Sequence, residues 1–178
     1  MMVTIILACE AAFWIAAATG LLLRYVARWR QASTVVLAMV PLIDVALVTA
    51  VAIDVYNGAA VTGVHRLAGI YLGWTVVFGK STIAWLDGWF AYKFAGAPRP
   101  EKKPKEGPEA MQNEIRAFVK WLAAAGIAIA VCFGLSVTVA DATQATELRG
   151  VLQPLLLITI VWFVTGPAWV KGKTEAKK

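Results

Sequence analysis

Long apolar runs, separated by short polar segments, make up most of the sequence. Five of these runs are close to 20 residues long, and a helix of about 20 residues crosses about 30 Å of hydrocarbon. The pattern therefore predicts an all-α fold, a polytopic membrane helix bundle of five transmembrane helices in one transmembrane domain over residues 1–178. We place the helices near residues 3–23, 34–53, 67–91, 117–140 and 150–170.

The third run differs from the others because it carries charged residues through an apolar stretch. On a helix, residues three, four or seven positions apart share a face, and small residues on such a face let a neighbouring helix approach. A Lys or Asp at membrane depth must face protein or water rather than lipid. One stripe of this run combines both kinds of residue and predicts a polar centre inside the bundle; its members are Arg66, Gly69, Gly73, Lys80, Ala84 and Asp87.

Prolines predict where the helices are interrupted. Pro41 lies inside the second run, where it removes one backbone donor and favours a kink. Pro154 permits a bend near the start of the fifth run. After the third run comes a segment rich in Pro, Lys and Glu, whose four prolines exclude a continuous helix. We therefore predict a cytoplasmic linker over residues 95–110.

Composition agrees with the membrane assignment. The chain is 60% hydrophobic and its mean hydropathy is +0.68, which is far more apolar than an average soluble domain. The net charge of +6 comes from Lys and Arg in the short flanks of the apolar runs. The sequence contains no helix-turn-helix pattern and no platform of mixed aromatic and basic residues, so we expect no nucleic-acid partner.

The distribution of Lys and Arg predicts the orientation. In the predicted topology, 14 of the 17 basic residues fall on one side, and an excess of basic residues marks the cytoplasmic side. We therefore expect the N-terminus outside and the C-terminus in the cytoplasm. The expected location is the inner (plasma) membrane, as a multi-pass protein.

The few cysteines and the single histidine bear on metal binding. The chain has two cysteines, both within apolar runs, and one histidine, without a CxxC pair. These residues do not match the spacing of a metal site. We expect no metal and no cofactor.

Two charged residues deep in the membrane are expected to compensate each other. Asp44 lies about 15 Å from the cytoplasmic end of the second helix, and Lys80 lies about 20 Å from the outer end of the third. Because these depths nearly meet, an ion pair would keep both charges in the membrane at the lowest free-energy cost. Alternatively, Lys80 extends toward the cytoplasm and Asp44 acts alone.

Three groups that can exchange protons share a level near the outer leaflet: Glu10, Asp54 and His65. Two carboxyls and an imidazole at one depth can set each other's protonation, so one interpretation is a role in acid catalysis. The alternative is structural. Glu10 would then be a helix-end glutamate that bonds a neighbour, and His65 would cap the start of a helix.

Aromatic and further polar residues complete the predicted site. A protonated carboxyl in an apolar pocket can act as a general acid, and aromatic faces can stabilise a developing cation. We add Asp44 to Glu10, Asp54 and His65 as candidate catalytic residues. The candidate substrate-binding residues are Trp14, Tyr71 and Trp74, expected to wall an outer pocket, together with Lys80, Trp85 and Asp87.

Several motifs together resemble a known family. They are E-x-x-FW from Glu10, RYVARWR from Arg24, PLID from Pro41, Asp54, HRLAGIYLG from His65, FGKS from Phe78, WLD from Trp85 and FAGAPRPEKKPK from Phe94. In these motifs the chain resembles the small bacterial integral membrane proteins called YmcC-like, which are common in actinobacteria and bacilli. The resemblance covers the first three spans and the linker. It implies an all-helical membrane fold and no particular chemistry.

Three classes of function stay open. The first is an enzyme or binder for a lipid-soluble, isoprenoid-like molecule, which as an enzyme would be a lyase or isomerase working in the style of a terpene cyclase. The second is a proton- or ion-coupled transporter, with Glu10, Asp44, Asp54 and Lys80 as the relay; five spans would then require a homo-oligomer. The third is a structural or assembly subunit. The expected partners are membrane lipid and a lipid-soluble small molecule.

Overall fold

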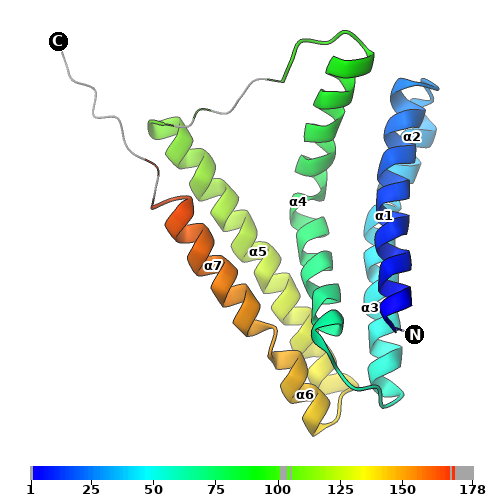
Figure 1. Ribbon diagram of the computed structural model, residues 1–178, viewed down its shortest axis with the longest axis vertical. Coiled ribbons are helices and arrows are strands. Elements are labelled where there is room, and N and C mark those ends of the chain that lie inside the picture. The colour runs from blue at the N-terminus through cyan, green and yellow to red at the C-terminus, as the bar shows by residue number, and fades with distance from the viewer. Residues whose placement is uncertain (1, 101–103, 105, 169, 171–178) are drawn as a thin grey trace, which may run out of the picture.

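The computed structural model describes residues 2–100, 104, 106–168 and 170, and for residues 2, 3, 6, 7, 10, 30 and 41 it describes the backbone alone. Every regular element within these residues is a helix, which confirms the all-α fold. Successive long segments run up and down the long axis of the molecule (Figure 1). They are α1 (Met2–Tyr25), α2 (Arg30–Ala38), α3 (Val40–Tyr56), α4 (Gly63–Phe94), α5 (Pro108–Thr138), α6 (Ala142–Arg149) and α7 (Leu152–Thr165).

Four helical segments among the described residues are long and apolar enough to cross a membrane: Gln31–Tyr56, Gly63–Phe94, Pro108–Thr138 and Ala142–Thr165. Within α1, the stretch Ala11–Tyr25 is a shorter apolar helix. The chain is therefore a multi-pass membrane protein, whereas the count of five transmembrane helices and the orientation stay predictions. Following the predicted orientation, we call the end that carries the α3–α4 turn the outer end.

Two of the membrane segments are interrupted, and a proline accounts for each interruption. The segment α2–α3 breaks at Met39, and Pro41 stands in the first turn of α3, which confirms the predicted kink. The segment α6–α7 breaks at Gly150 and Val151. Pro154 has no N–H to donate to the Gly150 carbonyl, and the backbone N–H of Gln153 donates to that carbonyl instead, at 3.3 Å.

The helix ends differ from the predicted ones where the ends are polar. α4 begins four residues before the predicted third run, and α5 begins at Pro108 instead of residue 117. The last segment begins with α6, whose sequence ATQATELR is polar and precedes the predicted fifth run. A search for apolar runs detects the part of a helix that lies in hydrocarbon and misses the turns that extend beyond it.

α4 is the central helix, and it packs against different neighbours along its length. Its outer half lies against α5 at Gly69 and Gly73. A Cβ at Gly69 would lie 3.0 Å from the Cys132 sulfur and 3.2 Å from the Ala128 carbonyl oxygen, and one at Gly73 would overlap the Ala124 carbonyl. Small residues therefore bring the two backbones into contact, as predicted for this stripe.

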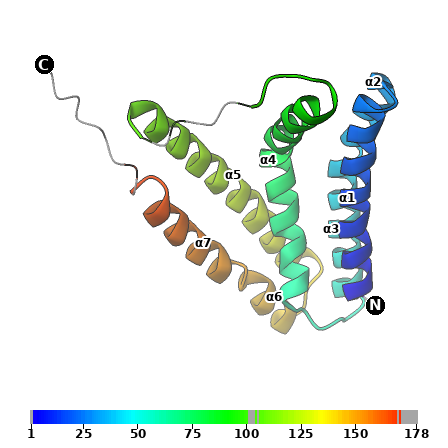
Figure 2. The ribbon, with the colours of Figure 1, turned by 45° about the horizontal axis from the view of Figure 1, so that its top comes forward.

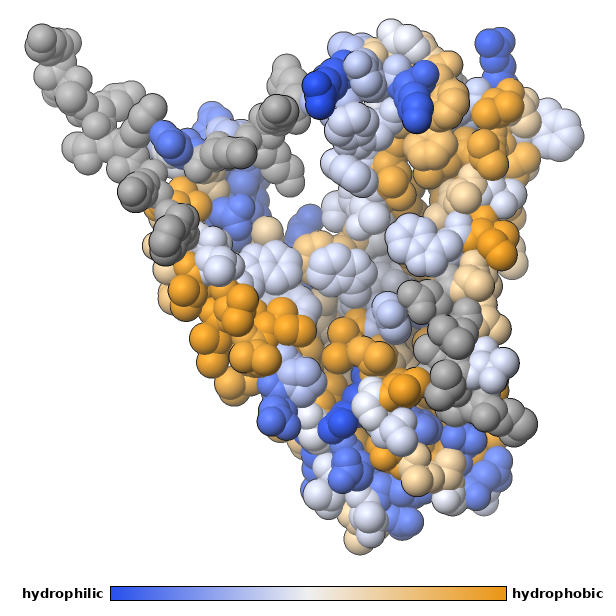
Figure 3. Space-filling view, in the orientation of Figure 1, coloured by the Kyte–Doolittle hydropathy of each residue, from blue (hydrophilic) through white to orange (hydrophobic). Residues whose placement is uncertain are grey.

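Toward the inner end, α4 and α5 diverge. The two views of the ribbon agree on this separation (Figures 1 and 2), and the space-filling view is hollowed between the upper part of α4 and the α5–α7 pair (Figure 3). Lys80 belongs to this inner half and is exposed. The predicted polar stripe is therefore divided, with its glycines buried against α5 and Lys80 outside the packed region.

Candidate functional site

His65 and Asp54 are the predicted site residues that the structure brings into contact. His65 lies in the first turn of α4 and Asp54 in the last turn of α3, and the short turn between these helices places them side by side. His65 Nε2 lies 3.1 Å from Asp54 Oδ2, and the His65 side chain is 4% exposed compared with 27% for Asp54. The predicted convergence of these two groups is thus present in the fold.

The other ring nitrogen of His65 determines its tautomer. The backbone N–H of Thr62 donates to His65 Nδ1 at 3.1 Å, so this nitrogen is an acceptor and carries no proton. In a neutral imidazole the proton is then on Nε2, from which it is donated to Asp54. Both ring nitrogens are therefore committed, one to the cap of α4 and one to α3. This is the structural alternative named for His65, a histidine that caps a helix.

The remaining members of the predicted outer pocket are Glu10, Trp14, Tyr71 and Trp74. The Glu10 side chain lies outside the described residues. Trp74 follows His65 by nine positions, which is about 180° around a helix, and it stacks on Phe78 with ring centroids 4.3 Å apart. Trp14 is 62% exposed and Tyr71 is 38% exposed. Trp74 and His65 therefore lie on opposite faces of α4, and the aromatic wall of an outer pocket stays a prediction.

The predicted ion pair between Asp44 and Lys80 is wrong. Asp44 of α3 is buried and faces Thr75 of α4. Lys80 lies five residues beyond Thr75, about 140° around the helix and about 7.5 Å further along it.

Trp85 and Asp87, two further predicted substrate-binding residues, lie at the inner end of α4. Trp85 is 61% exposed and contacts Trp89 edge-on, with centroids 6.2 Å apart. Asp87 Oδ1 lies 3.3 Å from Arg24 Nε at the end of α1, and the Tyr25 hydroxyl donates to the Asp87 carbonyl at 3.0 Å. Asp87 therefore joins two helices, and the roles of both residues toward a substrate stay predictions.

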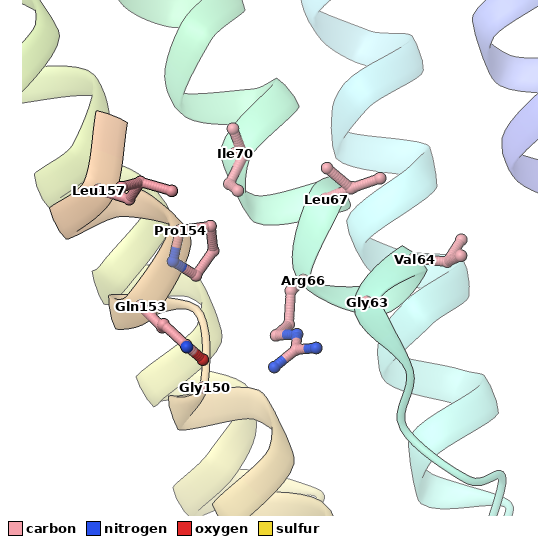
Figure 4. A pocket seen from close by; sticks show the side chains of 9 residues that line it. All are labelled: Gly63, Val64, Arg66, Leu67, Ile70, Gly150, Gln153, Pro154 and Leu157. Atoms are coloured by element: carbon pink, nitrogen blue, oxygen red, sulfur yellow. The ribbon is translucent and has the colours of Figure 1, made fainter. Parts of the chain in front are cut away.

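A groove lies at the outer end, between α4 and the break in α6–α7 (Figure 4). We call it the outer groove. Its volume is about 640 Å³, within the range of about 300–1,000 Å³ that is common for small-ligand sites. Its lining residues are Gly63, Val64, Arg66, Leu67, Ile70, Gly150, Gln153, Pro154 and Leu157. Neither Asp54 nor His65 is among them.

The polar side chains of the outer groove point toward each other. Arg66 reaches from α4 toward Gly150, and Gln153 projects toward Arg66 from the opposite wall, with Ile70 and Leu157 further along the groove (Figure 4). The guanidinium of Arg66 fits here because residue 150 has no side chain, since a Cβ at this position would overlap Arg66 Nη1. The break at Pro154 and the glycine at 150 thus shape a groove with one charged end and one apolar end.

A comparison with known proteins now bears on the family. A protein of Bacillus subtilis (strain 168), named "Uncharacterized membrane protein YmcC", is 27% identical to this chain over 168 residues, which are 94% of this chain and 90% of that protein. The predicted resemblance to YmcC-like membrane proteins is confirmed. No protein-family model matches the chain, and no solved structure matches it.

The match to YmcC covers more of the chain than the motifs do. The motifs lie in the first three spans and the linker, whereas 94% coverage includes spans four and five as well. The YmcC-like similarity therefore reaches both walls of the outer groove. It agrees with a membrane protein, and it assigns no activity.

Sequence reasoning missed Gln144, the buried residue that joins the two sides of the outer end. Its side-chain amide donates to the carbonyls of Val55, at 3.0 Å, and Ala59, at 2.8 Å. Gln144 is held in place by a reciprocal capping box with Asp141 at the start of α6. The pattern D-x-x-Q in the sequence is the signal that could have located this helix start. Its two bonds connect α6 to the end of α3 and fix one side of the α3–α4 turn.

Proposed function

We propose that this membrane protein binds a lipid molecule in the outer groove. The observation that supports the proposal is the chemistry of the groove lining, where Arg66 and Gln153 stand at one end and Leu67, Ile70 and Leu157 at the other. An amphiphile has the same division between a polar and an apolar part. Because the polar helix α6 meets the apolar helix α7 at Gly150, the groove spans the level at which headgroup and acyl chain meet.

The orientation is part of this proposal, because it places the groove in the outer leaflet. Two variants with one new cysteine at an exposed position, made in a chain in which Cys9 and Cys132 are replaced by Ala, test it in intact cells with a membrane-impermeant maleimide. Asn57→Cys, in the α3–α4 turn, should be labelled, and Pro104→Cys, in the linker, should not. The reverse labelling pattern would place the groove at the cytoplasmic leaflet.

Filling the groove tests the binding function. Leu156 and Leu157 are both exposed, by 62% and 63%, but only Leu157 lines the groove. We expect Leu157→Trp to reduce the amount of lipid that co-purifies with the protein in mild detergent, measured by mass spectrometry per mole of protein. Leu156→Trp is the matched control. Equal retention by the two variants would contradict binding in this groove.

A second candidate function is acid catalysis on a lipid-soluble substrate, which is favoured by the contact between Asp54 and His65. Since both nitrogens of His65 are committed, the exchangeable proton on this pair would pass through the partly exposed Asp54 carboxyl. Asp54→Asn keeps the shape of the side chain and removes its acid function. We expect this variant to stay folded and to lose any conversion of added membrane lipids that the parent protein performs. Conversion that survives Asp54→Asn would contradict catalysis by this pair.

A further inference from the structure

Arg66 has more hydrogen-bonding capacity than the protein uses. A guanidinium carries five N–H donors, and within the described residues the acceptor of Arg66 is the Glu147 carbonyl, at a long 3.4 Å. Among all described residues, the ion pairs are Arg24 with Asp87 and His65 with Asp54. Arg66 therefore has no carboxylate partner among these residues. A cation at the membrane boundary that lacks a protein anion is expected to bind an anion from its surroundings.

The position of the guanidinium restricts the identity of that anion. Arg66 stands about 5 Å from the start of α4, beside Gly150, where the polar α6 ends and the apolar α7 follows. The groove continues from this point along Ile70 and Leu157, which are apolar. An anion in this place would therefore be attached to a hydrocarbon chain. Phospholipid supplies this combination, with a phosphate that suits the planar fork of a guanidinium.

We propose that Arg66 binds the phosphodiester of an outer-leaflet phospholipid, an inference that rests on the proposed function of the groove. The Arg66 guanidinium donates to the phosphate oxygens, and the Gln153 amide is placed to donate from the other wall. One acyl chain follows Leu67, Ile70 and Leu157. The weak bond to Glu147 is replaced, and Gly150 keeps the space that the guanidinium needs.

The test uses the full-length protein, delipidated in detergent, with two probes that share their acyl chains. Dioleoylphosphatidylglycerol carries the phosphodiester and dioleoylglycerol does not, and binding of each is titrated by native mass spectrometry. We expect Arg66→Gln to weaken phosphatidylglycerol binding about tenfold and to leave dioleoylglycerol binding unchanged. The matched control is Arg149→Gln, at the other outer arginine, which bonds Ser136 and lies over Phe133 rather than in the groove.

Two further variants keep the test decisive if Arg66→Gln does not fold. Arg66→Lys preserves the charge but not the planar fork, and Gly150→Ala preserves Arg66 but occupies its space; both should weaken phosphatidylglycerol binding and spare dioleoylglycerol. Equal affinity of the parent protein for the two probes would overturn the role of the phosphate while leaving lipid binding in the groove intact. Absence of binding by either probe would overturn both. Full competition by millimolar inorganic phosphate would show a site for free phosphate and would also overturn the inference.

Discussion

The outer and inner halves of α4 are attached to the rest of the molecule by different interactions. At the outer half, two glycines bring α4 against α5, and the cap at His65 and the Gln144 side chain secure the α3–α4 turn. At the inner half, α4 is joined to α1 through the Arg24–Asp87 contact, whose side chains are 37% and 26% exposed. The outer half is thus held by buried contacts and the inner half by a partly solvated one.

This difference shows what holds helices together in a membrane. Lipid chains are as apolar as leucine, so burying apolar side chains does not favour one neighbour over another. Close backbone approach and satisfied polar groups decide where helices associate. Both occur together at the outer end of this molecule, which explains why α4 and α5 meet there and separate toward the inner end.

Breaking the close approach at Gly73 should have the largest effect on stability. A side chain there would overlap the Ala124 carbonyl, which is helix backbone and cannot rotate away. We expect Gly73→Val to lower the free energy of unfolding by about 3 kcal/mol or more, measured by thermal unfolding in detergent. Gly126→Val is the control, because nothing lies within 4 Å of a Cβ at Gly126. Similar losses in both variants would contradict the proposed importance of the α4–α5 contact.

Removing the Gln144 amide should have the next largest effect. Gln144→Met keeps the length of the side chain but leaves the carbonyls of Val55 and Ala59 without this donor. The expected loss in the free energy of unfolding is about 1–3 kcal/mol. The exposed Gln153 gives the comparison, with Gln153→Met expected to stay within about 0.5 kcal/mol of the parent. A Gln144 variant as stable as the Gln153 variant would show that the outer end does not depend on this residue.

The inner contact should be weaker than either outer one. Asp87→Asn removes the charge that faces Arg24, and a partly exposed ion pair contributes about 0.2–1 kcal/mol. The effect should also decrease at high salt, because exposed charges are screened. A loss larger than that of Gln144→Met would reverse the comparison between the two halves.

The smallest expected effect is the coupling between Asp44 and Lys80. Since Asp44 is buried facing Thr75 and Lys80 is exposed, the changes Asp44→Asn and Lys80→Met should add in the double variant to within about 0.5 kcal/mol. The measurement is a double-mutant cycle of thermal unfolding. If the double variant loses clearly less stability than the sum of the two single losses, the hypothesis of an ion pair between Asp44 and Lys80 is supported again.

The sequence alone determined the membrane-spanning character of the chain, its helices and their interruptions. Apolar runs, prolines and the small residues at 69 and 73 act locally or along one helix face, so their consequences follow from spacing. The motifs also led to the YmcC-like resemblance. Asp54 and His65 were placed together correctly because the turn between their helices is short and leaves few alternatives.

Apart from Asp54 and His65, only the tertiary structure decided which polar side chains meet across helices. Depth along a helix predicts a level but not a direction around the axis, and Lys80 lies about 140° around α4 from Thr75, the residue that faces Asp44. The outer groove required α6 to lie beside α4, and its position depends on the break that Pro154 makes and on the space that Gly150 leaves. The sequence of a single helix does not predict this groove, because its two walls come from segments that are far apart in the chain and meet only when the helices pack together.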